Sequence, residues 1–291
     1  EIKMYRDLPQ SYVGELLDVL LWPGHPLGMN LAGTLESVSR IKVSDVADFH
    51  DRFYQPANIV CAVSGNIKHK NILQQLSGLF SKAKAKPGIT SKKADNVQEK
   101  IGTKFFYKDT EQSHLAIGYH SPGRSHPDRH VAGLLHIILG ANMSSRLFHE
   151  VREKKGLAYE IGTHVRYFRD TGVFVIHAGV DNRKVSPAIS TILKEIQKIS
   201  NYRVTKEEFS RAKEYCTGQL LMALEDTLDH MLWIGEQEIA LNRIKSMQEI
   251  LNEINKVSVD DCLRLAGNIF KTKHLNIAVI GPQVCKEQAG I

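Results

Sequence analysis

The sequence of 291 residues lacks the marks of several protein classes. No stretch reaches about 18 consecutive apolar residues, so no membrane span is predicted. The first residues, from Glu1 to Asp7, show no basic segment followed by an apolar one, which is the pattern of a secretory leader. Glycine-rich phosphate loops and Gly-x-Ser-x-Gly elbows do not occur either, so neither a nucleotide-phosphate site nor a serine nucleophile is predicted.

Cysteine is scarce, and no Cys-x-x-Cys pair occurs. The first three of the four cysteines lie in apolar-periodic segments, where burial raises the pKa of a thiol and favours a free, inert side chain. Such usage favours a reducing compartment. The four are Cys61, Cys216, Cys262 and Cys285.

The positive charge of the chain is local. The formal net charge is +6, and lysines crowd into one short stretch with aromatics only at its edge, Phe105 and Phe106. A lysine-rich stretch of this kind is more typical of a solvated linker than of a nucleic-acid site, so no nucleic-acid partner is expected. The lysines are Lys82, Lys84, Lys86, Lys92, Lys93, Lys100 and Lys104.

The second part of the chain has a clear pattern of elements. Apolar periodicity and β-branched runs predict a strand at 115–119, helices at 128–139 and 144–155, and a hairpin of 157–168 with 173–180. Gly156 is a natural left-handed helix stop. Asp181 or Asn182 is expected to cap a helix toward Ile199, and two more helical stretches are predicted over 206–255.

An internal repeat suggests two similar halves. A shift of 216 positions (257 minus 41) superimposes two units of a capped helix, a polar turn, an apolar strand and a closing glycine. The predicted strands are Ile59–Val63 and Leu275–Ile280. The matched residues are Ile41, Val43, Asp45, Phe49, Phe53, Ile59 and Gly65 with Val257, Val259, Asp261, Leu265, Ile269, Leu275 and Gly281.

The repeat predicts three parts. Residues 1–82 form the C-terminal part of an incomplete first domain, 83–100 a basic linker, and 101–291 a complete second domain homologous to the first. Strands separated by several helices, together with an antiparallel hairpin, predict an α+β fold with mixed or antiparallel sheets packed against helices.

Several blocks resemble the pitrilysin/insulinase family of zinc peptidases, in the branch that includes the mitochondrial processing peptidase. The resemblance covers essentially the whole chain in order. Its segments are residues 1–9 (EIKMYRDLP), 24–28 (GHPLG) with 33–34, 49–58, and above all 144–148 (SSRLF) with 151–159 (VREKKGLAY). It independently implies two homologous halves that close like a clamshell around an unfolded substrate strand.

The resemblance also implies a zinc cofactor. Family members hold the metal with a His-x-x-Glu-His helix plus a distant Glu, and the Glu inside the motif is the general base. That motif does not occur in this sequence, and its isolated histidines are expected to be structural or surface residues. Glu1 resembles the distant third ligand, although a solvated terminal Glu stays open as an alternative. One carboxylate cannot hold catalytic zinc, so this chain alone is expected to be inactive.

Arg152 and Tyr159 are the candidate catalytic residues. Spacing alone favours a surface arginine paired with a glutamate, and a tyrosine packed in a sheet. The resemblance of the whole block instead implies that both are hydrogen-bond donors, which stabilise the oxyanion that forms when water attacks the scissile carbonyl group. By resemblance the preceding loop lines the substrate region, with an ordinary loop and helix cap as the alternative. Its residues are Asn142, Met143, Ser144 and Ser145.

The sequence therefore leaves two alternative functions. In the first, the full-length protein is a zinc endopeptidase that cleaves peptides or unfolded segments, which add to the edge of a sheet such as the hairpin 157–180. In the second, it is a non-catalytic partner subunit that holds extended peptides. For the oligomeric state, a homodimer and a heterodimer are alternatives. We expect a bacterial cytoplasmic protein, with the mitochondrial matrix as the alternative.

Overall fold

The computed structural model describes residues 1–80 and 91–282. The chain divides into two compact units. The first unit consists of Glu1–Gly33, Ala94–Thr217 and Gln248–Ile291, and the second consists of Thr34–Lys93 and Gly218–Met247. In the described part of the chain, no helix is long and apolar enough to cross a membrane.

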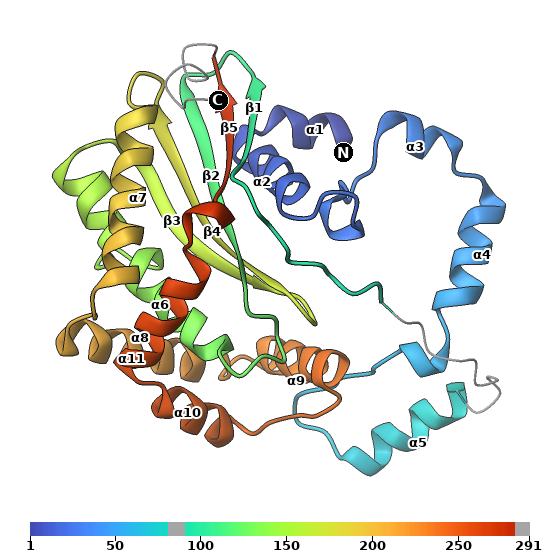
Figure 1. Cartoon of the computed structure of the whole chain (residues 1–291). Helices are drawn as coiled ribbons and strands as arrows, with labels where there is room; N and C mark the ends of the chain where they lie inside the picture. The colour runs from blue at the N-terminus through green and yellow to red at the C-terminus, as the bar shows by residue number, and fades with distance from the viewer. Residues whose placement is uncertain (81–90, 283–291) are drawn as a thin grey trace. The chain divides into compact units, whose positions relative to one another are not determined.

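A five-stranded mixed sheet lies at the centre of the first unit (Figure 1). The strand order is β1-β5-β2-β4-β3, in which β1 and β5 are parallel and every other neighbouring pair is antiparallel. The strands are rich in β-branched and aromatic residues, as a pleated surface favours. They are β1 (Gly102–Tyr107), β2 (Gln112–Ser121), β3 (Ala158–Tyr167), β4 (Gly172–Asp181) and β5 (Asn276–Gly281).

Three helices cover one face of this sheet. They bury apolar residues against Leu115, Ile117 and Phe174, and this cluster is the main core of the unit. Arg264 of the third helix donates two hydrogen bonds, of 3.0 and 2.7 Å, to the Asp128 carboxylate before the first helix. The helices are α6 (Arg129–Gly140), α7 (Val185–Asn201) and α11 (Val259–Ile269).

A helix from the start of the chain covers part of the opposite face. This helix, α2 (Pro9–Leu21), begins with a proline at its first position and packs Leu17 and Leu21 on the sheet beside Ala116 and Val175. Its contact is close: a Cβ at Gly118 would lie 2.8 Å from Leu17 Cδ2, so a larger residue there would force the Leu17 side chain to move. The sheet is therefore buried on both faces.

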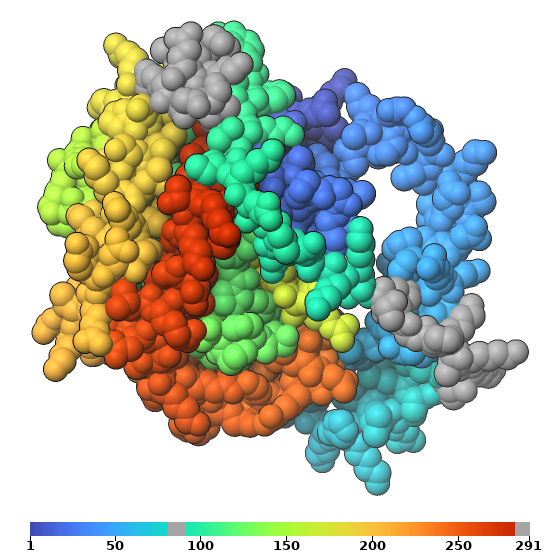
Figure 2. Space-filling view, viewed as in Figure 1, coloured from blue at the N-terminus to red at the C-terminus, as the bar shows by residue number. Residues whose placement is uncertain are grey.

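The remaining elements of the first unit are short or peripheral. They are α1 (Ile2–Asp7), η1 (Pro26–Gly28), the π-helical segment η3 (Phe148–Lys154), α8 (Lys206–Ala223, in this unit as far as Thr217), α10 (Met247–Lys256) and η4 (Thr272–His274). In the space-filling view α7 and α11 lie side by side on the surface (Figure 2).

The second unit is helical and has little core. Its helices are α3 (Leu35–Arg40), α4 (Val43–Phe53), η2 (Pro56–Asn58), α5 (His69–Phe80) and α9 (Thr227–Leu241). Among the described residues, every buried apolar side chain belongs to the first unit. Within the second unit Gly235 lies close to Ala62, because a Cβ at Gly235 would be 3.2 Å from the Ala62 methyl.

Most sequence expectations for the first unit are confirmed. The fold is α+β, the hairpin forms β3 and β4, and the two predicted helices correspond to α6 and to the helical turns around η3. Gly156 has φ of 55° and ends that helical segment as predicted. The division at 1–82, 83–100 and 101–291 stays a prediction, and residues 83–90 of its linker lie outside the described residues.

Three local predictions are wrong. Residues 59–63 form no strand, because no neighbouring described strand offers them hydrogen bonds. Helix α7 begins at Val185 after Lys184; the Asp181 carboxylate instead accepts from the Arg183 N–H at 2.8 Å, and the Asn182 amide donates to the Thr110 carbonyl. Three helices, rather than two, occupy residues 206–256.

Candidate functional site

Arg152 lies on the π-helical segment η3 with its charge unpaired. Its neighbours pair with one another: His149 Nδ1 lies 3.1 Å from Glu153 Oε2, and Lys154 Nζ lies 2.6 Å from Glu150 Oε1. Within the described residues no carboxylate pairs with Arg152. A guanidinium left without a carboxylate is available to an external oxygen ligand.

The face of an aromatic ring holds this guanidinium. Arg152 Cζ lies 5.0 Å from the centroid of the Phe148 ring, within the range of a cation–π interaction. Leu147 and Val151 are fully buried and anchor the segment against the core. Segments of π-helix are rare and frequent at functional sites, so η3 itself marks this region.

A tight turn connects η3 to the start of β3. The Gly156 N–H donates to the Arg152 carbonyl at 3.2 Å, and the Leu157 N–H donates to the Val151 carbonyl at 2.9 Å. Tyr159 is the extra residue of a β-bulge, since Ala158 pairs with Val180 and Glu160 with the adjacent Gly179. Its side chain is 59% exposed. Bulges often re-aim a side chain beside an active site.

Strand β3 is an edge of the sheet. Among the described strands it pairs only with β4, so its outer side offers main-chain groups to another extended chain. The bulge and the end of η3 lie at the beginning of this edge. The sheet therefore provides a place for a peptide strand next to Tyr159.

The predicted substrate loop lies beside two cavities. The Ser144 N–H donates to the Asn142 side-chain oxygen at 2.9 Å and the Ser145 N–H donates to the Asn142 carbonyl at 3.1 Å, which fixes a tight turn. Asn142, Met143 and Ser144 line a cavity of about 410 Å³ shared with α8. Met143, Ser144 and Ser145 line a second one of about 610 Å³.

Two features of this loop concern its chemistry. The Ser145 hydroxyl is buried without a hydrogen-bond partner. The Arg146 guanidinium donates two hydrogen bonds, of 2.7 and 2.6 Å, to the Glu208 carboxylate and ties the loop to α8. These bonds raise the pKa of Arg146. Arg146 is therefore part of the scaffold, in contrast to the unpaired Arg152.

The histidines near the sheet lie in largely buried surroundings that are typical of structural residues. Burial lowers the pKa of His136 to about 4, and its Nδ1 lies 2.7 Å from the Thr163 hydroxyl. Burial also lowers the pKa of His164 to about 4, and its ring lies 5.7 Å from that of His177. These groups are neutral near pH 7.

The described residues do not fit a zinc site by themselves. Residues 1–80 and 91–282 contain no group of three His, Cys, Asp or Glu side chains that could hold a metal ion. Glu1 is exposed, and its carbonyl accepts the Tyr5 N–H at 2.9 Å at the start of α1. Its assignment as a third ligand stays a prediction.

Sequence reasoning did not identify Phe148 as the partner of Arg152. The signal was present, because the two residues are four positions apart on a predicted helix and such pairs lie on one face. Nor did it identify Glu208 as the anchor of the substrate loop. That pair joins residues 62 positions apart, which only the tertiary structure brings together.

Comparisons with known proteins agree with these observations. The family described as "Peptidase M16 inactive domain" matches residues 40–216. A Bacillus subtilis protein named as an uncharacterized zinc protease is 31% identical over 97% of this chain and 68% of its own length. Another from Mycobacterium leprae is 29% identical over 99% of this chain and 65% of its own length. The chain thus spans about two thirds of the length of these relatives.

Solved structures share the fold. A protease from Helicobacter pylori has a TM-score of 0.88 at 21% identity, with 96% of this chain and 68% of that one covered. A chain of Complex III2 from Candida albicans has a TM-score of 0.86 at 21% identity, with 99% and 69% covered. Together with the sequence matches, these findings show that the chain belongs to the pitrilysin/insulinase (M16) peptidase family and is of its inactive-domain type.

Proposed function

We propose that this chain is the substrate-holding and oxyanion-stabilising part of a zinc-dependent endopeptidase of the processing-peptidase-like branch. The observation that carries the proposal is the unpaired Arg152 guanidinium on η3, next to the exposed Tyr159 at a β-bulge. Both are hydrogen-bond donors, and a turn of a few residues separates them. The names of the sequence relatives as zinc proteases support the reaction class.

Arg152 and Tyr159 act on the scissile carbonyl group. As water adds to the carbonyl carbon, negative charge develops on its oxygen. The guanidinium donates charge-assisted hydrogen bonds to that oxygen, and the phenol donates one more. Because Arg152 does not have to break an ion pair with a carboxylate first, little reorganisation is needed when the charge develops.

The substrate is an extended peptide or an unfolded segment of a protein. It adds as a strand to the free edge of β3, where main-chain hydrogen bonds give affinity that is independent of sequence. Side chains of the substrate enter the cavities beside Asn142, Met143, Ser144 and Ser145. The Ser145 hydroxyl is a candidate partner for a polar substrate atom.

The metal belongs to the whole protein and not to this chain alone. The described residues hold no three-ligand group, and the sequence contains no His-x-x-Glu-His. We propose Glu1 as one ligand, with the remaining ligands outside this sequence, so the 291 residues alone are inactive. The proposed location is the bacterial cytoplasm, with the mitochondrial matrix as the alternative.

The test uses full-length protein in which a His-x-x-Glu-His motif is intact. Arg152→Ala should lower kcat for cleavage of an unstructured peptide by roughly a hundredfold, because one oxyanion donor is worth about 3 kcal/mol. Zinc content should not change. Arg169→Ala, an exposed arginine in the β3–β4 turn, is the matched control. Cleavage that is unchanged by Arg152→Ala would remove the assigned role.

A second function is a non-catalytic partner subunit that holds extended peptides, as a homodimer or a heterodimer. The description of the matched family as an inactive domain favours this reading. In that case the full-length protein should bind the same peptide through the β3 edge without cleaving it, even with zinc added. Mixing it with a catalytic subunit should then restore cleavage, and Arg152→Ala should reduce the restored rate.

A further inference from the structure

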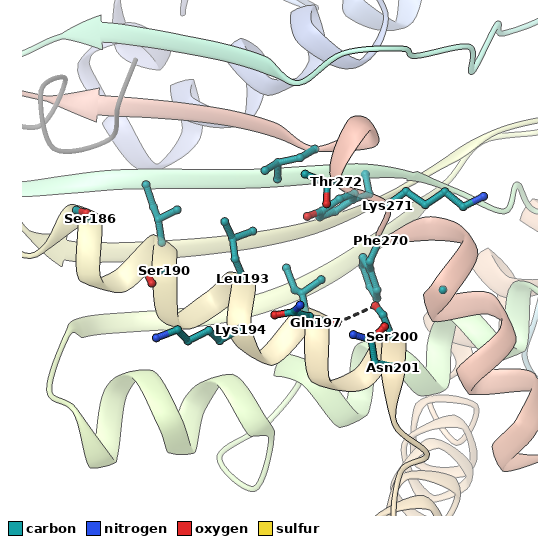
Figure 3. A pocket seen from close by; sticks show the side chains of 15 residues that line it. Ser186, Ser190, Leu193, Lys194, Gln197, Ser200, Asn201, Phe270, Lys271 and Thr272 are labelled. Atoms are coloured by element: carbon teal, nitrogen blue, oxygen red, sulfur yellow. Dashed lines mark hydrogen bonds between the residues drawn. The ribbon is translucent and has the colours of Figure 1, made fainter.

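A separate cavity lies on the helical face of the first unit. Its volume is about 800 Å³, within the range of ligand sites. One wall is the length of α7, and the other is the segment from the end of α11 through η4 to Leu275 (Figure 3). Residues Ser186 to Asn201 line it, a span of about 22 Å along the helix axis.

The lining of this cavity includes a phenol that has no protein hydrogen-bond partner among the described residues. Tyr119 of β2 is only 2% exposed and packs edge-on against Phe270, with ring centroids 5.2 Å apart. Within the described residues its hydroxyl has no hydrogen-bond partner, and burial alone raises the pKa of Tyr119. The hydroxyl oxygen itself is not fully enclosed, so it opens to the cavity and can donate a hydrogen bond to a ligand there.

The charge of the lining has one sign. It includes Lys194 on α7 and Lys271 before η4, and it includes no Asp or Glu. Neither lysine forms an ion pair with a described residue. In Figure 3 the two lysine side chains extend in opposite directions, so the positive charge is spread along the cavity, where it favours a negatively charged ligand.

The wall of α7 combines apolar and polar side chains. Ile189, Leu193 and Ile196 face the cavity together with Ser190 and Gln197. The Ser200 hydroxyl is already used, because it donates to the Ile196 carbonyl at 2.8 Å (Figure 3). An elongated apolar body therefore fits this wall, with few polar groups to orient it.

We propose that this cavity binds an amphipathic organic carboxylate. Its carboxylate accepts the hydrogen bond of the Tyr119 hydroxyl in the positive field of Lys194 and Lys271, while its apolar body lies along Leu193 and Ile196. This binding site is independent of Arg152 and of the proposed peptidase function.

The test titrates the isotope-labelled chain with decanoate, below its micelle concentration, and with decan-1-ol as the uncharged match. Amide signals of α7 and of residues 267–275 should shift with decanoate and respond about tenfold more weakly to decanol. Tyr119→Phe, which removes only the hydroxyl, should weaken decanoate binding by about tenfold. The double substitution Lys194→Gln with Lys271→Gln should weaken it several-fold, by about threefold for each charge.

Lys273→Gln is the matched control, because Lys273 is an exposed lysine of η4 outside the lining. Equal affinity for decanoate and decanol would overturn the proposal, and so would signal changes outside the cavity or a Lys273→Gln effect equal to that of the double variant. Thermal unfolding reports whether Tyr119→Phe remains folded. If it does not, the surface lysine variants decide the question.

Discussion

Helices α4 and α11 have the same length and the same start, yet they differ in burial. Each has 11 residues, and each has an aspartate whose carboxylate accepts the N–H of the capping residue: Lys42 to Asp45 at 2.8 Å and Ser258 to Asp261 at 3.0 Å. Leu265 of α11 is 4% exposed. Phe49, its counterpart in α4 after the shift of 216 positions, is 55% exposed.

The segments that follow these helices differ in the same way. Residues 276–281 form β5 between β1 and β2, whereas residues 59–63 form no strand. The two sequences are alike, so the difference is not in local preference. It teaches that capping residues specify where a helix begins, while a neighbouring sheet decides whether its apolar face is buried and whether the next segment pairs.

The largest expected difference concerns the apolar faces. Leu265→Ala should lower the free energy of unfolding of the first unit by about 3 kcal/mol, because it leaves a cavity in the core. Phe49→Ala should cost less than about 1 kcal/mol. Urea unfolding followed by Trp22 fluorescence in a Trp233→Phe background measures the first loss, since Trp22 then reports on the first unit alone, and amide exchange of α4 measures the second. Equal losses would mean that α4 is packed as tightly as α11.

Ion pairs should show a smaller difference. Arg146→Ala should lower the free energy of unfolding by about 2 kcal/mol, because it leaves the largely buried Glu208 carboxylate unpaired. Arg40→Ala removes the exposed pair with Glu36 and should change it by less than about 0.5 kcal/mol. The same urea assay measures the effect of Arg146→Ala, and amide exchange of α3 measures that of Arg40→Ala. Joint replacement of Arg146 and Glu208 by apolar residues should recover most of the loss; a failure to recover would point to packing instead of charge.

Acid should weaken the first unit by a comparable or smaller amount. His136 has a pKa of about 4 when folded and about 6.5 when unfolded, so below pH 6.5 the unfolded chain binds a proton that the folded chain excludes. Stability is fully present above pH 6.5 and is lost as the pH falls toward 4. The loss at pH 5.5 is on the order of 1 kcal/mol.

The His136→Gln variant provides the control for this pH dependence. Glutamine retains a hydrogen-bonding group for Thr163 but does not titrate, so the difference in urea midpoint between pH 7 and pH 5.5 should shrink. An unchanged difference would assign the effect to other groups, such as His164 and His177.

The smallest expected effect concerns the caps. Ser258→Ala removes the acceptor of the Asp261 N–H and should cost roughly 0.5 to 1 kcal/mol of first-unit stability. Thr34→Ala removes the corresponding acceptor of the Ser37 N–H at the start of α3, in the second unit. It should leave first-unit unfolding unchanged and only speed amide exchange over residues 35–40. A global effect of Thr34→Ala would contradict the separation of the two regions.

Local sequence signals predicted the parts of the site that depend on neighbouring residues. Gly156 marked the end of the helical segment, and the β-branched runs on both sides of residues 169–171 marked the hairpin. The block around Arg152 and Tyr159 also identified the family. Glycine stops and alternating strands act over a few residues, so a single sequence contains them.

Features that join distant segments were not predictable in this way. Helix α2 packs on strands about a hundred residues or more away in the sequence, and the Tyr119 cavity brings β2 together with α7 and η4. The bulge at Tyr159 depends on its pairing with β4. Each requires knowledge of which elements meet, and apolar periodicity indicates only that a face is buried.

The π-helical turns of η3 give the direction of Arg152 an unusual dependence on chain length. A π-turn accommodates one residue more than an α-turn between the same flanking anchors. Removing His149 or Glu150 should therefore let the segment relax to an α-helix while Leu147 and Val151 keep their places in the core. Phe148 and Arg152 would then be three positions apart instead of four, which is about 300° around an α-helix and changes the position of the guanidinium relative to the ring. The length of this short segment, and not only the identity of its residues, thus sets the contact that holds Arg152.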